Sequence, residues 1–139
     1  MKFLLDTSVY SQPIKRKPLA SVIHHWKFHP EREYAISALC ELEVLQGVKR
    51  AESQRLTEAY RTILRGRFPV LPFDAACAEM FAEIQTSCVR DGRTRPAINL
   101  MIAVTAIVHG LELATCNAAD FLGLPGLKVA DWTIPLAGG

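Results

Sequence analysis

The chain has 139 residues and a formal net charge of +2, from 16 basic and 14 acidic side chains, and half of its residues are hydrophobic. This length predicts a single domain, residues 1–139, whose core needs no disulfide or metal to hold it. The near-neutral charge is no argument for a nucleic-acid-binding protein, and the longest apolar run, Leu100 to Val108, is too short for a membrane span.

Five short apolar runs have the length of buried strands: Lys2–Leu5, Tyr34–Ile36, Pro69–Leu71, Leu111–Thr115 and Lys128–Ala130. Between them lie segments with helical spacing of apolar residues: Leu19–Phe28, Ala38 to about Arg50, Thr57–Arg67, the helix after Asp74, and Pro96–His109. Asn117 to Leu122 is expected to form a short turn or helix, and Leu136 to Gly139 an irregular tail.

Capping residues mark several helix starts. Ser37 and Asp74 are good N-caps, Pro96 suits a first helical position, and Thr7 and Ser8 can cap a helix after the first strand. Strands that alternate with helices predict an α/β fold, with a short central parallel sheet of four to five strands and helices on both faces.

The four cysteines are far apart in sequence and form no C-x-x-C motif: Cys40, Cys77, Cys88 and Cys116. They are expected to be reduced, buried thiols. Only three apolar residues separate Lys2 from Asp6, which is too few for the apolar region of a signal peptide. We therefore expect a cytoplasmic protein.

Acidic and amide side chains are expected at one edge of the sheet, because ligands of open parallel sheets bind beyond the carboxyl ends of the strands. Asp6 follows the first strand, Asp120 comes soon after the fourth, and Glu43 and Asn99 lie on neighbouring helices. Clustered carboxylates repel one another unless a cation neutralises them. Oxygen ligands without Cys or His suit Mg²⁺ or Mn²⁺, which can activate water for phosphodiester cleavage.

Structural alternatives exist for each of these residues. Asp6 could cap a helix, Asp120 could cap a turn, and Asn99 could be a satisfied amide in a buried helix. Glu41 and Glu43 could both be solvated helix residues, and helical geometry does not separate them because both border apolar positions.

Four segments together carry a resemblance that covers nearly the whole chain: FLLDTSVY, IS-ALCELEVLQG, AINLMIAVTAIVHGLELATCNAADF and GLKVADW. The sequence resembles the PIN-domain ribonucleases, specifically the VapC-type toxins of bacterial toxin–antitoxin pairs. By this resemblance Asp6, Glu43 and Asp120 match metal-binding and catalytic acidic positions of the family. Further matches are polar positions that could orient ligands or water: Thr7, Ser8, Thr115 and Asn117.

Asn99 departs from the family pattern, since the family usually has Asp at the position three residues before Ile102-Ala103. It would be the fourth member of the catalytic and metal-binding set, with its charge removed. Asn99 is either the natural residue or a deliberate Asp→Asn change that makes a toxic enzyme tolerable. Cys116 also stands where a basic residue is common.

The resemblance implies a PIN-like fold and a Mg²⁺- or Mn²⁺-dependent endoribonuclease that acts on structured RNA. It also implies a homodimer and a cognate VapB-type antitoxin. The antitoxin would bind in a groove of this chain that the helices from Leu19 to Phe28 and from Ala38 to Arg65 help to form. The alternative is a catalytically inactive PIN-fold module that still binds antitoxin and RNA. A nuclease for DNA flaps is disfavoured, because the chain is short for holding branched DNA.

Overall fold

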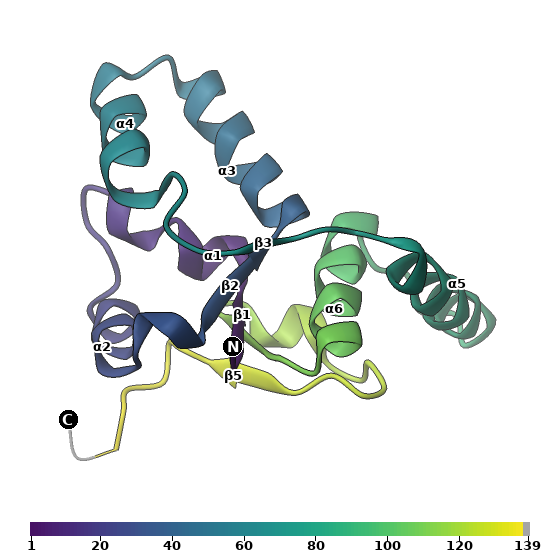
Figure 1. Ribbon diagram of the computed structural model, residues 1–139. Helices are drawn as coiled ribbons and strands as arrows, with labels where there is room; N and C mark the ends of the chain where they lie inside the picture. The colour runs from purple at the N-terminus through teal and green to yellow at the C-terminus, as the bar shows by residue number, and fades with distance from the viewer. Residues whose placement is uncertain (138–139) are drawn as a thin grey trace.

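The computed structural model describes residues 1–137, so the expected tail at 136–139 lies partly outside the described residues. Five short strands form a parallel sheet in the order β3-β2-β1-β4-β5 (Figure 1). Their bounds are β1 (Phe3–Leu5), β2 (Tyr34–Ser37), β3 (Val70–Leu71), β4 (Glu112–Thr115) and β5 (Val129–Asp131). The predicted α/β class and all five predicted strands are confirmed.

Helices connect the strands along residues 1–137. They are α1 (Thr7–Tyr10), α2 (Ala20–Phe28), α3 (Ala38–Ala51), α4 (Gln54–Ala59), α5 (Ala75–Arg90) and α6 (Ala97–His109). Shorter helical turns are η1 (Gln12–Ile14), η2 (Glu31–Glu33), the π-helical η3 (Tyr60–Leu64) and η4 (Ala118–Phe121).

The sheet separates two hydrophobic cores, and β1 shows why. Successive side chains of a strand point to opposite faces, so Phe3 and Leu5 join one core while Leu4 joins the other. The first core is covered by α1 to α4, and the second by α5 and α6 (Figure 1). All three residues of β1 are buried, as expected of a central strand in a parallel sheet.

Trp132 closes the first core at the end of β5, with 1% of its surface exposed. Its ring stacks on His25 at 5.2 Å and on His29 at 5.7 Å between centroids, and it meets Phe3 edge-on. A hydrogen bond of 2.7 Å joins His25 Nε2 to the Ile134 carbonyl. These contacts hold the end of the described chain against α2.

Two helix predictions need correction. Thr7 and Ser8 do not cap α1: Asp6 is the N-cap, and Thr7 is the first helical residue. The basic helix expected over Thr57–Arg67 begins earlier and ends earlier, because Ser53 caps α4 at Leu56 N and the chain then widens into the π-turn. The caps predicted at Ser37 and Asp74 are confirmed.

Within residues 1–137, no helix is long and apolar enough to cross a membrane.

Candidate active site

The candidate site lies at the carboxyl ends of β1 and β4. The chain leaves β1 toward β2 on one side, while β4 pairs with β1 on the other, so strand order reverses at this point. Parallel α/β sheets bind ligands at such a switch point. Asp6 follows β1 directly, and its backbone N–H donates to the Ala114 carbonyl of β4 at 2.9 Å.

Asp6 is the centre of the site, and only 6% of it is exposed. Its Oδ1 accepts from the Thr7 backbone N–H at 2.8 Å. Its Oδ2 accepts from Ser8 Oγ at 3.0 Å and from Thr115 Oγ1 at 2.8 Å. These donors fix the carboxylate in one orientation. Asp6 is a helix cap, and this role does not exclude the predicted role in a metal site.

Burial raises the pKa of Asp6 above its usual value, and the charge of Asp120 raises it further. The hydrogen bonds from Thr115, Ser8 and Thr7 oppose this shift without cancelling it. A carboxylate whose charge is costly in the folded chain gains most from a nearby cation.

The start of α1 and the segment that follows β4 are hydrogen-bonded to each other at the sheet edge. The Cys116 N–H donates to Ser8 Oγ at 3.0 Å, and the Asn117 N–H donates to Thr115 Oγ1 at 2.9 Å. Asn117 thus contributes its backbone to this network, while the residue as a whole is exposed. Ser8 and Thr115 hold both the Asp6 carboxylate and the loop that leads to Asp120.

The structure separates the two glutamates that helical spacing did not. Glu43 accepts from Thr7 Oγ1 at 2.5 Å, next to Asp6. Glu41 instead accepts from two phenols, Tyr10 at 3.2 Å and Tyr60 at 2.6 Å. Glu43 belongs to the polar network around Asp6, whereas Glu41 ties α3 to α1 and η3.

Asn99 and Asp120 line a cavity of about 390 Å³ on the α6 side of the site. Thr7 and Glu43 line another hollow of about 230 Å³, beside α3. Asp6 is connected to residues of both hollows. It accepts a hydrogen bond from the Thr7 N–H, and the charge of Asp120 contributes to its raised pKa.

Among residues 1–137, no three His, Cys, Asp or Glu side chains lie close enough together to form a ready-made metal cluster. The physical reason is the division just described: Glu43 is bonded to Thr7, and the α6 corner carries the amide Asn99 in place of a carboxylate. In kind, the donors still suit a hard cation, because Asp6, Glu43, Asn99 and Asp120 all offer oxygen atoms.

Arg95 is a site neighbour that sequence reasoning missed. It lines the cavity with Asn99 and Asp120, and its guanidinium donates to the Asp120 carbonyl at 2.6 Å. The available signal was its place in a basic cluster with Arg90 and Arg93, directly before Pro96, the cap of α6.

Comparison with known proteins agrees with this fold. The PIN domain model matches residues 3–124. The tRNA(fMet)-specific endonuclease VapC of Shigella flexneri is 32% identical over 136 residues, covering 96% of this chain and 99% of the relative. Toxin FitB of Neisseria gonorrhoeae is 29% identical over 137 residues, covering 93% of this chain and 97% of that toxin.

Solved structures agree with these relatives. The crystal structure of FitAcB from Neisseria gonorrhoeae aligns with a TM-score of 0.85 at 26% identity, covering 95% of this chain and 99% of that one. DNA-bound VapBC from Salmonella typhimurium aligns with a TM-score of 0.81 at 26% identity, covering 95% and 98%.

The chain belongs to the PIN-domain family, and its fold is the PIN fold. Its relatives place it among the VapC-type endoribonuclease toxins, which confirms the resemblance found in the sequence.

Proposed function

We propose that this chain hydrolyses RNA phosphodiester bonds as the toxin of a type II toxin–antitoxin pair, using a divalent metal held by Asp6, Glu43, Asn99 and Asp120. The observation that best supports this proposal is the Asp6 carboxylate. It is buried where the strand order reverses, and hydrogen bonds from Thr7, Ser8 and Thr115 orient it. A buried carboxylate with a raised pKa in a cleft is typical of a functional site, whereas capping a helix requires only an exposed Asp, Ser or Thr.

Mg²⁺ or Mn²⁺ fits the donor set, and when bound it would supply an activated water and charge stabilisation at the scissile phosphate. The placement of the four side chains is consistent with such a role. Asp6 is fixed by its three donors, and Glu43 is held beside it through Thr7. Asn99 offers a carbonyl oxygen, and the exposed Asp120 carboxylate faces the same cavity.

We propose structured RNA as the substrate, with tRNA the first to test, because the Shigella relative and its Salmonella counterpart are both named tRNA(fMet)-specific. Exposed basic side chains border both hollows: Lys15 lines the hollow of Thr7 and Glu43, and Arg93 lines the cavity of Asn99 and Asp120. Such cationic groups can bind the RNA phosphate backbone, which the carboxylates would repel in the absence of metal. The reaction would take place in the cytoplasm.

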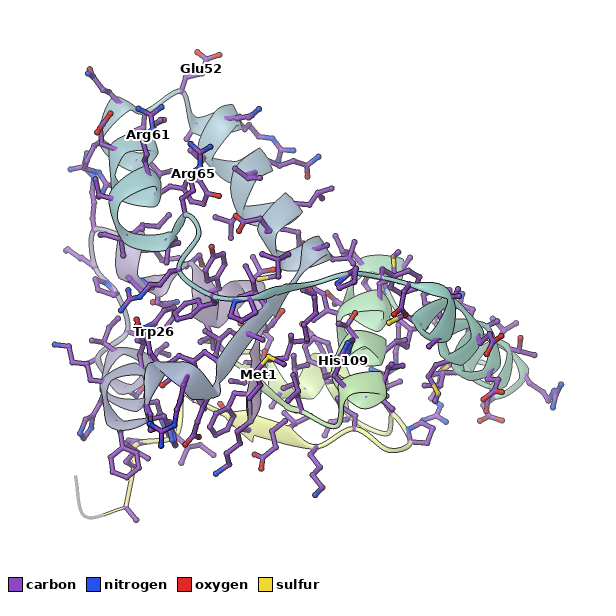
Figure 2. All side chains as sticks on the ribbon, in the orientation of Figure 1. Met1, Trp26, Glu52, Arg61, Arg65 and His109 are labelled. Carbon is purple, nitrogen blue, oxygen red and sulfur yellow. The ribbon has the colours of Figure 1, made fainter. Side chains whose placement is uncertain are left out.

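We propose a cognate VapB-type antitoxin that binds beside α3. Two adjoining hollows lie there, of about 230 and 350 Å³, and both are lined by Val48. Arg61 and Arg65 border the larger one on the side facing α3 (Figure 2). An antitoxin arginine reaching Glu43 and Asp6 would neutralise the site by bidentate pairing.

A homodimer is part of the same proposal. The exposed apolar side chains Leu42 and Val70, 46% and 47% exposed, line a further hollow between α3 and β3 that a second copy could cover. Size-exclusion chromatography with light scattering tests this, and a monomer at micromolar concentration would reject it.

The second candidate is a PIN-fold module that binds antitoxin and RNA without cleaving. Asn99 favours it, because an amide supplies no negative charge where the family usually has Asp. Losing one anionic ligand is expected to weaken metal binding by about 10-fold or more, comparable to other changes around metal sites.

The test is cleavage mapping of total cellular RNA with Mg²⁺ or Mn²⁺, comparing the chain with its Asn99→Asp and Asp6→Ala variants. We expect Asn99→Asp to cleave faster and to inhibit growth more strongly, and Asp6→Ala to be inactive. No cleavage by any form would establish the binding module. Unchanged cleavage in Asn99→Asp, with loss in Asp6→Ala, would remove Asn99 from the metal site.

A further inference from the structure

Arg95 joins the two segments that carry the α6-side ligands. It lies just before α6, on which Asn99 follows four residues later, and its guanidinium crosses to the loop after β4. Nη1 donates to the Asp120 carbonyl at 2.6 Å, and Nη2 donates to the Leu122 carbonyl. One planar group thus binds two carbonyls at the C-terminal end of η4.

Gly123 provides a second, independent observation. Its φ of +78° is a conformation that favours glycine. A Cβ at this position would lie 2.8 Å from Arg93 Nη1 and 3.8 Å from Arg95 Nη2. The loop that carries Asp120 therefore passes directly against both arginines.

We propose that Arg95 is a positioning residue that sets the location of the Asp120 segment relative to Asn99. The proposal rests on the proposed function of the site, because position matters there only if both side chains share a ligand. The fixed fork of a guanidinium can bind two carbonyls at once, whereas a lysine ammonium is a point donor on a flexible stem. Arg95→Lys should therefore keep the charge and lose the bridge.

Arg93 is the matched control. It lines the same cavity and carries the same charge, but its guanidinium is hydrogen-bonded to Asp91 at 3.1 Å. Removing either positive charge should by itself strengthen cation binding at an acidic site. A weakening that is confined to the Arg95 variants would consequently come from lost positioning and not from charge.

The experiment measures Mn²⁺ affinity by calorimetry, amide hydrogen exchange of residues 118–123 without metal, and RNA cleavage, in the chain as it is and with Asn99→Asp. We expect Arg95→Lys and Arg95→Met to exchange faster at 118–123 and to bind Mn²⁺ about 10-fold more weakly or worse. Arg93→Met removes a packing contact beside Gly123 but no hydrogen bond to the loop, so it should raise exchange much less than the Arg95 variants and should not weaken Mn²⁺ binding.

Unchanged exchange and Mn²⁺ affinity in Arg95→Lys would overturn the proposal. Arg95→Met and Arg93→Met could instead raise the KM for RNA equally, with hydrogen exchange and Mn²⁺ affinity unaltered. That result would also overturn the proposal, because it would make Arg95 a contact to the RNA phosphate backbone. If the parent chain binds no Mn²⁺, the proposed metal site fails, and hydrogen exchange alone still decides whether Arg95 holds the loop. A thermal melt of each variant confirms that it is folded.

Discussion

Glu41 and Glu43 lie two residues apart on α3, and their substitutions should have opposite effects. Glu41 accepts from the phenols of Tyr10 and Tyr60 at 3.2 and 2.6 Å. Hydrogen bonds to a charged group contribute about 1.5–3 kcal/mol each to folding stability. Because Glu41 is partly exposed, we take the lower value for each of its two hydrogen bonds. Glu41→Ala should therefore cost about 3 kcal/mol, or on the order of 10 °C in Tm for a chain of this size.

Glu43→Ala removes one hydrogen bond, from Thr7, and also relieves negative charge beside Asp6. Its cost in folding free energy should stay at about 1 kcal/mol or less. In the Asn99→Asp background it should abolish cleavage, while Glu41→Ala should cleave normally at temperatures well below its Tm.

Urea unfolding in EDTA measures the free energy of unfolding of each variant. RNA cleavage is measured separately, at about 20 °C below the Tm of each variant, so that every variant is folded. A spectroscopic control is available, because burial and the Glu41 carboxylate raise the pKa of Tyr60 to about 12. Glu41→Ala should move that pKa down toward the usual tyrosine value. A double-mutant cycle with Tyr60→Phe should show a coupling of about 1 kcal/mol or more.

The reasoning would be refuted by a folded Glu41→Ala that no longer cleaves, or by a Glu43→Ala that still does. A Glu41→Ala protein as stable as its parent would show that the two phenols find equal partners elsewhere.

Three further outcomes are expected. Ser37→Ala should cost about 1 kcal/mol in urea unfolding, because its buried hydroxyl caps α3 at Cys40 N; an unchanged midpoint would contradict this. Trp132→Ala should cost about 3–5 kcal/mol, since it empties a buried ring site, and a loss under about 1 kcal/mol would contradict that packing. Burial lowers the pKa of His29, so the unfolded chain takes up this proton first and stability should fall as pH drops below about 6.5, by at most about 1.4 kcal/mol per pH unit. His29→Gln should flatten that slope, and an identical pH profile in the variant would assign it to other groups.

The strands and caps could be predicted because their causes are local. Ser37 and Asp74 precede apolar helical patterns, and β1 is a run of three buried residues ended by Asp6. The bounds of α4 and η3 could not be predicted, because the π-turn depends on tertiary contacts, among them the bond between Tyr60 and Glu41.

The site divides in the same way. Asp6, Thr7, Ser8 and Thr115 were named from the sequence, and the structure brings them together through hydrogen bonds. Periodicity could not separate Glu41 from Glu43, because their difference lies in partners 31 and 36 residues away. Arg95 escaped notice because a basic cluster on a loop does not reveal which arginine turns inward to a backbone carbonyl.

The bond between Thr115 and Asp6 spans 109 positions of the chain, and this separation has a consequence for biosynthesis. Domains are built from the N-terminus during translation, so a nascent chain that ends within α6 possesses Asp6 but neither Thr115 nor Asp120. The proposed hydrolytic centre would therefore form only when the ribosome has nearly finished. Products of premature termination would consequently be harmless to the cell that makes them, and only an almost complete toxin would call for an antitoxin.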